Sequence, residues 1–224
     1  MGTLYWQLND CWPAASWSSV DYHGRWKALH YRARDAYAPH IVSITQRCDT
    51  IDVHIISDIE FPAGWELALE LIDFSGEVLR EERWPVRIEL LGAAPYRRLM
   101  RQELLDDDAL DRTLLSAELR DGEGTTRSRA LHYFVEPKLL RLERPRIEIQ
   151  SEHAGVGTRT LLVTAGYLAK GVYLGLEGAD AFFSHNYFDI LPGDTLMIDL
   201  YARPSDLERL DERITIRTLY DTLP

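Results

Sequence analysis

The sequence predicts a mainly β protein in which two antiparallel β-sandwiches follow a single β/α unit. From residue 41 onward, hydrophobic and polar residues alternate with the period of two that is typical of half-buried strands. Groups of turn-forming residues separate these short runs. Before residue 41, one amphipathic stretch has helical spacing. With 224 residues, of which 46% are hydrophobic, the chain is long enough to bury two small cores.

The first part, residues 1–40, is predicted to hold one strand, one polar loop and one helix. The strand is expected over residues 2–7 and the helix over residues 24–37, where Pro39 stops it. Asp21 is expected to cap the start of the helix. Because one β/α unit is half of a parallel-sheet repeat, it cannot be stable alone. We therefore expect residues 1 to about 17 to be mobile or covered by a second copy of the chain.

The second part, residues 41–137, is predicted to be the first sandwich. Ile51, Val53 and Ile55 alternate with polar residues, which places one face of their strand on a core. Further strands are expected at residues 65–71, 78–84, 97–103, 114–119 and 129–134. Pro137 stiffens the exit from the last of these strands and marks the joint between the sandwiches.

The third part, residues 138–224, is predicted to be a second, smaller sandwich. Turns rich in glycine and proline separate its short apolar runs. Its strands are expected at residues 146–150, 158–165, 172–176, 194–202 and 214–220. The two sandwich cores are expected to include Val53, Leu67, Leu69, Leu161 and Val163.

Charge, hydropathy and cysteine usage narrow the class of protein. The formal net charge is −11, from 36 acidic and 25 basic residues, and it argues against nucleic-acid or anionic-membrane partners. No apolar run reaches transmembrane length and the first residues lack a signal-peptide pattern, so we expect a soluble chain, with a cytoplasmic and an exported parent both open. Cys11 and Cys48 lie outside metal-binding spacings and are expected to be free thiols. The seven histidines form no ligand pattern, so neither a metal nor a cofactor is expected.

The candidate functional site is the segment of residues 6–17, where three tryptophans lie among polar residues. The face of an indole such as Trp6 or Trp12 matches the apolar C–H face of a pyranose ring. Neighbouring amide and carboxylate groups, here Asn9 and Asp10, can form hydrogen bonds with the sugar hydroxyls. The segment is therefore predicted to face a carbohydrate. The alternative is a hydrophobic cluster that plugs one end of a domain.

Two other stretches are predicted to be structural. The acidic run at residues 103–111 lacks the spacing of a calcium-binding loop and is expected to be a solvated loop with a short helical turn. The aromatic stretch at residues 182–189 could offer a platform for a sugar. Aromatic residues more often anchor a loop to the core, and that is the expectation here.

Several segments resemble one enzyme family. The stretch GTLYWQLNDCWP at residues 2–13, with shorter matches that continue to residue 29, resembles the end of the catalytic barrel in β-mannosidases of glycoside hydrolase family 2. HYFVEPK at residues 132–138 is similar to the junction between the two C-terminal immunoglobulin-like domains of that family. NYFDILPG at residues 186–193 resembles a segment of the last domain. The resemblance spans the whole chain.

The resemblance implies a retaining exo-β-mannosidase with its active site on the C-terminal face of a (β/α)₈ barrel. Residues 1–40 would be the last strand, loop and helix of that barrel, and the two sandwiches would be immunoglobulin-like. Trp6 matches the tryptophan that forms a floor for the sugar, while Asn9, Asp10 and Trp12 fall in the following loop. The two catalytic glutamates of the family lie on earlier barrel strands, so no catalytic residue is assigned and the chain alone is expected to be inactive.

The expected partners follow from this reading. They are a mannoside substrate, bound through the complete enzyme, and the rest of the catalytic barrel. Self-association through exposed aromatic residues near the N-terminus is a further expectation. Two other functions stay open: a stand-alone, non-catalytic carbohydrate-binding β-sandwich module, and an adhesion-type pair of immunoglobulin-like domains.

Overall fold

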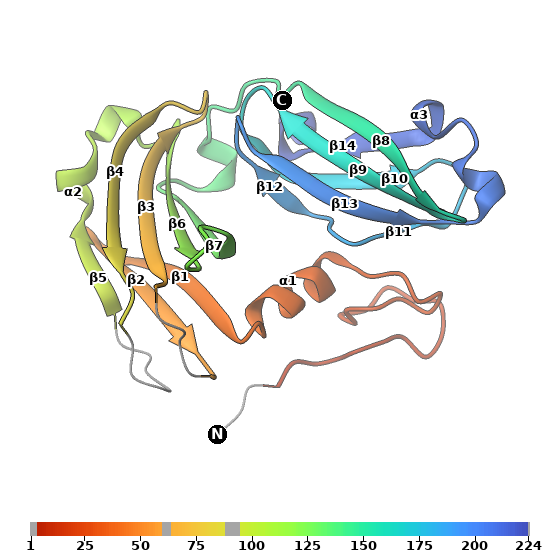
Figure 1. Cartoon of the computed structure of the whole chain (residues 1–224), viewed down its shortest axis with the longest axis horizontal. Coiled ribbons are helices and arrows are strands. Elements are labelled where there is room, and N and C mark those ends of the chain that lie inside the picture. The colour runs from red at the N-terminus through yellow and green to blue at the C-terminus, as the bar shows by residue number, and fades with distance from the viewer. Residues whose placement is uncertain (1–3, 60–63, 88–94, 224) are drawn as a thin grey trace. The chain divides into compact units, whose positions relative to one another are not determined.

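The computed structural model describes residues 4–59, 64–87 and 95–223 of the chain (Figure 1). Antiparallel sheets dominate these residues and a short helix precedes them, which confirms the predicted fold class. The chain divides into two compact units. One unit is continuous, Ala38–Glu143, and the other combines Met1–Tyr37 with Arg144–Pro224. No helix in the described ranges is both long and apolar enough to span a membrane.

The unit Ala38–Glu143 is a sandwich of two antiparallel sheets. One sheet has the strand order β1-β2-β5 and the other has the order β4-β3-β6-β7. The strands are β1 (His40–Arg47), β2 (Thr50–Ser57), β3 (Glu66–Asp73), β4 (Val78–Pro85), β5 (Pro95–Met100), β6 (Thr113–Arg120) and β7 (Thr126–Tyr133). Val53 from the first sheet shares a core with Leu67 and Leu69 from the second, so these three predicted core residues are confirmed.

The acidic run of this unit forms short helical turns between β5 and β6. They are α2 (Arg101–Leu104) and η1 (Asp107–Ala109), and a third turn, η2 (Pro137–Leu139), follows β7. The strand expected at residues 97–103 ends at Met100 because Arg101 turns the chain. Its guanidinium donates hydrogen bonds to the carboxylates of Asp49 and Asp107. Among the described residues, no group of acidic, histidine or cysteine side chains could hold a metal ion.

The second unit contains the second sandwich. Its sheets have the orders β11-β13-β9-β8 and β12-β10-β14. The strands are β8 (Ile147–Gly155), β9 (Thr158–Ala165), β10 (Ala169–Leu176), β11 (Phe182–Phe183), β12 (Phe188–Ile190), β13 (Thr195–Tyr201) and β14 (Ile214–Arg217), with the turns η3 (Pro204–Leu207), α3 (Leu210–Arg213) and η4 (Leu219–Thr222). Leu161 and Val163, both fully buried, lie in the core between the sheets, as predicted.

The N-terminal part of this unit departs from two expectations. Residues 4–7 form no strand, because a barrel strand needs neighbouring strands and no strand of the described chain pairs with these residues. The helix α1 (Ala28–Ala36) begins later than residue 24, and its N-cap is Lys27. Asp21 does not cap it. The Asp21 carboxylate instead accepts the backbone N–H groups of His23 and Arg25 at 2.8 and 2.9 Å, closing its own turn.

The two compact units do not follow the order of the sequence, because one of them combines the first and the last stretch of the chain. The predicted division into residues 1–40, 41–137 and 138–224 stays a prediction. The structure adds that the first stretch packs with the last one in a single compact unit. Helix α1 therefore has a partner for its apolar face within this chain.

Candidate functional site

The predicted sugar-facing tryptophans lie open on the surface of their unit. Trp6 is 77% exposed, Trp12 is 68% exposed and Trp17 is 77% exposed. Large side chains with such exposure are uncommon on a folded surface, because each leaves an apolar ring in water. The three indoles are therefore available to a sugar or to another polypeptide surface.

Asp10, in contrast, points into its own loop and is only 7% exposed. The Ser16 hydroxyl donates a hydrogen bond to Oδ1, and the Lys27 ammonium donates to Oδ2 at 3.1 Å. The Ser16 hydrogen bond, together with those of Lys27 and Ser18, holds the pKa of Asp10 below its ordinary value. The carboxylate stays ionised and fixes the loop, so it is unsuited to donating a proton. Asn9 is exposed beside it, and its side-chain amide donates to the Asp10 carbonyl at 3.2 Å.

Ser19 links helix α1 to the segment of residues 6–17 that carries the three exposed tryptophans, which we call the tryptophan loop. Its backbone N–H donates to the carbonyls of Gln7 and Leu8 at 3.0 and 3.1 Å, and its hydroxyl donates to Leu8 at 2.9 Å. The same hydroxyl lies 3.0 Å from Nδ1 of His30, on the helix. Ser19 is fully buried, so these contacts form in a site shielded from water. The backbone that carries Trp6 is thus tied to the helix by hydrogen bonds.

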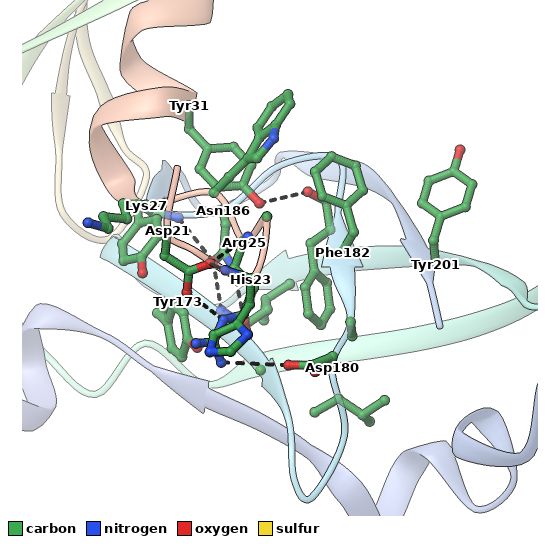
Figure 2. Close-up of a pocket in the computed structure, with 18 of the residues that line it drawn as sticks. Asp21, His23, Arg25, Lys27, Tyr31, Tyr173, Asp180, Phe182, Asn186 and Tyr201 are labelled. Atoms are coloured by element: carbon green, nitrogen blue, oxygen red, sulfur yellow. Dashed lines mark hydrogen bonds and ion pairs between the residues drawn. The ribbon is translucent and has the colours of Figure 1, made fainter. Parts of the chain in front are cut away.

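Helix α1 is held in turn by β11 and by the loop that follows it. The Tyr31 hydroxyl donates to the Phe183 carbonyl at 2.9 Å, as Figure 2 shows. Arg32 donates to the Tyr187 carbonyl at 3.0 Å, and Arg34 donates to the Ser184 carbonyl at 2.6 Å. Burial raises the pKa of Tyr31 to about 12, so its hydroxyl keeps the proton that it donates. Three side chains of one helix thus bind β11 and the loop that follows it in the second sandwich.

A groove of about 550 Å³ opens between this N-terminal segment and the second sandwich (Figure 2). Six aromatic rings along it contact one another in series, with centroid separations of 5.0 to 6.0 Å. We call them the aromatic arc; in order they are Tyr173, Tyr187, Tyr31, Trp26, Phe182 and Tyr201. The polar residues Asp21, His23, Arg25 and Asp180 also line the groove.

The sequence pattern predicts the roles of only some of the residues that line this groove. Residues 182–189 were expected to anchor a loop to the core, and Phe183 does so with 3% exposure. Phe182 and Tyr187 instead belong to the aromatic arc. Tyr173 was missed, although its signal is local. It alternates with the buried Val172 and Leu174 on β10, which places its ring on the outer face of the sheet.

Comparisons with known proteins agree with this description. A model described as an Ig-fold domain, Ig_mannosidase, matches residues 142–222. A second, described as a Mannosidase Ig/CBM-like domain, matches residues 49–138.

The chain is 31% identical over 239 residues to β-mannosidase A of Aspergillus clavatus and 32% identical over 237 residues to that of Neosartorya fischeri. Each alignment covers 99% of this chain and 25% of the relative, so the chain spans about a quarter of the length of these relatives.

Solved structures show the same fold. A β-D-mannosidase from Dictyoglomus thermophilum superposes with a TM-score of 0.73 at 21% identity, over 95% of this chain and 25% of that one. An exo-chitosanase from Amycolatopsis orientalis superposes with a TM-score of 0.63 at 17% identity, over 96% of this chain and 29% of that one. At these identities the likeness establishes the fold alone.

Two successive immunoglobulin-like sandwiches, preceded by a segment with exposed tryptophans, define the chain as a set of accessory domains of the glycosidase type. The predicted resemblance is confirmed. The chain carries two immunoglobulin-like domains of the mannosidase type and corresponds to the C-terminal, immunoglobulin-like part of β-mannosidases.

Proposed function

We propose that the chain works as the C-terminal portion of a retaining exo-β-mannosidase, which hydrolyses terminal β-D-mannose residues from β-mannosides. It supplies a wall of the sugar site and two structural sandwiches, and it supplies no catalytic carboxylate. One observation carries the proposal: Trp6 and Trp12 are exposed on a loop that partly buried hydrogen bonds hold in place. A rigid, open aromatic surface suits a sugar ring, because binding then costs little ordering entropy.

The four candidate residues have different roles in this proposal. Trp6 forms a floor against the apolar face of the terminal mannose, and Trp12 lies at the rim. Asn9 offers an exposed amide to a hydroxyl. Asp10 acts through its neighbours, since its carboxylate is engaged by Ser16 and Lys27 and sets the course of the loop. The nucleophile and the acid/base carboxylate come from the rest of the barrel, as a retaining mechanism needs a pair about 5 to 5.5 Å apart.

The second sandwich has a positioning role in this reading. A continuous set of contacts runs from Phe183 through Tyr31 on helix α1, and from Lys27 and His30 to the tryptophan loop. Rigid support of this kind matters because small displacements of a sugar-binding wall reduce catalysis.

A second candidate function is a stand-alone carbohydrate-binding module without catalysis. The observation that favours it is the aromatic groove, which needs no residue outside this chain. The two functions differ in one respect: a module has no part in catalysis, whereas the wall of an enzyme site contributes to turnover once it lies beside a barrel.

The test uses the chain by itself and as part of a chimera in which it replaces the matching quarter of the Aspergillus clavatus enzyme. The chain alone should not hydrolyse an aryl β-mannoside. In an active chimera, Trp6→Ala should lower kcat/KM by about tenfold or more, because the indole positions the ring that is distorted in the transition state. Trp84→Ala, at a partly buried tryptophan of the first core, is the control and should reduce thermal stability more than kcat/KM.

Two results would contradict the proposal. Turnover by the purified chain, retained after removal of contaminating glycosidase, would show that it carries its own catalytic groups. A Trp6→Ala chimera with unchanged kinetic constants would show that Trp6 does not contact the sugar.

A further inference from the structure

The groove beside the aromatic arc has no part in the wall formed by Trp6, Asn9, Asp10 and Trp12. It is lined entirely by residues of the unit that joins residues 1–37 to residues 144–224. Its volume, about 550 Å³, lies within the range of sites that hold small ligands. The side chains that line the groove determine which class of ligand it could bind.

We propose that the groove is a second sugar-binding site, which takes a short uncharged oligosaccharide with Tyr173 and Tyr201 as stacking platforms and Arg25 and Asp180 as hydroxyl partners. Figure 2 shows the two tyrosines at opposite ends of the groove, with His23, Arg25 and Asp180 between them. The choice of mannosides as the first probes rests on the proposed function. The site itself rests on the geometry.

The two ends of the aromatic arc are open, unlike its middle. Tyr31 is 5% exposed and packs helix α1 onto the sandwich, so the central rings have a structural task. Tyr173 and Tyr201 are 37% and 46% exposed. Among the described residues, neither of their hydroxyls has a hydrogen-bond partner. Rings that are fixed on one side and open on the other are what a pyranose face stacks upon.

Gly175 leaves room for the ring of Tyr173. A Cβ atom at Gly175 would lie 3.4 Å from Cε1 of Tyr173 and 3.5 Å from its hydroxyl oxygen. The same atom would lie 2.7 Å from the Thr215 hydroxyl on β14, which is too close. With glycine at this position, the ring can lie along the outer face of β10. It thereby forms a platform instead of standing into solvent.

Arg25 is held in place before any ligand arrives. Its backbone carbonyl accepts the Asp21 N–H at 2.9 Å, and its Nε donates to the Asp21 carboxylate at 2.6 Å. Gly24 has a φ of +83°, which this turn requires and which glycine adopts without strain. The remaining guanidinium N–H groups face the groove, where Nη1 lies 3.6 Å from Asp180.

The pair of Arg25 and Asp180 suits hydroxyl groups better than a charged ligand. Both side chains are largely exposed, and an ion pair at 3.6 Å in water contributes little, so either group can exchange its partner for a sugar hydroxyl. An adjacent donor and acceptor match two neighbouring hydroxyls of a pyranose. With both signs present beside aromatic rings, the lining favours a neutral polyol over an anion or a cation.

The experiment is calorimetric titration of the whole chain with β-1,4-mannobiose and mannotriose, with cellobiose as a second neutral probe. Saturable binding is expected. Tyr201→Ala and Tyr173→Ala should each weaken it by about fivefold or more, the usual effect of removing an aromatic anchor. Asp180→Asn removes only a charge from an exposed position and should weaken binding without affecting folding. Tyr220→Ala, at another tyrosine with 37% exposure, is the matched control.

The outcomes separate this site from the tryptophan wall. Binding that is lost in Trp12→Ala and unchanged in the Tyr173 and Tyr201 variants would overturn the groove site and leave the proposed function intact. No saturable binding of any of the three sugars would also overturn it. Binding of cellobiose with equal affinity would support the groove as a site for neutral oligosaccharides without a preference for mannose.

Discussion

Asp10 and Asp21 are the two carboxylates nearest the exposed tryptophans in sequence, and both are engaged in local hydrogen bonds. Asp10 accepts from Ser16 and Lys27, whereas Asp21 accepts two backbone N–H groups and the Arg25 side chain. A carboxylate held in this way orders a loop at modest cost, because its hydration is replaced by donors already in place. At the scale of single residues, acidic groups in this segment therefore shape the surface and leave the contact with a ligand to aromatic rings.

His132 gives a prediction about pH at the same scale. Its Nε2 lies 2.7 Å from the Gln46 side-chain oxygen inside the first sandwich, and burial lowers the pKa of its imidazole. The unfolded chain therefore binds a proton more readily than the folded one, so this residue supports stability fully above about pH 6.5. That contribution declines as the pH falls through the lowered pKa of the folded state.

We expect His132→Gln to reduce the dependence of the melting temperature on pH between about pH 7.5 and pH 5. The measurement is a series of thermal melts at constant ionic strength. His153→Gln, at an exposed position on β8, is the control for the substitution itself. An undiminished slope in His132→Gln would assign the effect to other groups.

Among the elements, helix α1 depends most on its surroundings. It has nine residues and no side-chain cap at its N-terminus, and so short a helix is marginal in water. Its stability comes from the contacts of Tyr31, Arg32 and Arg34 with β11 and the loop after it. These residues gain cover in return, since Tyr31 packs on Tyr187 and Trp26 packs on Phe182.

Removal of residues 1–37 tests this mutual support. We expect the second sandwich to melt at a lower temperature, because Phe182 and Tyr187 lose their cover, while the unit Ala38–Glu143 keeps its own transition. Differential scanning calorimetry of both proteins resolves the two transitions. If both transitions stay where they are, the N-terminal segment is dispensable and the three-part division of the sequence is the better description.

The same elements show what could be predicted from the sequence. The alternation of Ile51, Val53 and Ile55 identified β2, because alternate residues of a sandwich strand face the core. The docking of Tyr31 on Phe183 joins residues 152 positions apart, and neither position carries a local signal for it.

The prediction of a strand at residues 2–7 was wrong over its described residues for a related reason. A barrel strand forms only beside neighbouring strands, and no described strand pairs with these residues. The sugar-facing role of Trp6 and Trp12 stays a prediction. The burial of Asp10 depends on Ser16 and Lys27 and could not be predicted from composition.

For the whole molecule, exposed indoles and a net charge of −11 act against each other. The indoles of Trp6, Trp12 and Trp17 favour association, and like charge opposes it. We expect association to rise with protein concentration and with salt, which screens the repulsion. Replacing all three tryptophans by serine should abolish it in sedimentation velocity experiments, whereas Trp84→Ser should not. Association that survives the triple replacement would place the contact elsewhere.

The discontinuous make-up of the second unit has a consequence for synthesis on the ribosome. Tyr31 is made 152 residues before Phe183, and at about 5 to 20 residues per second this interval lasts roughly 8 to 30 s. The residues of the other unit, Ala38–Glu143, are all made within that interval and can fold as they emerge. During that interval Trp26 and the apolar side of α1 have no cover from the second sandwich. The nascent chain should therefore be most open to chaperones, and most prone to aggregation, before the loop after β11 leaves the exit tunnel.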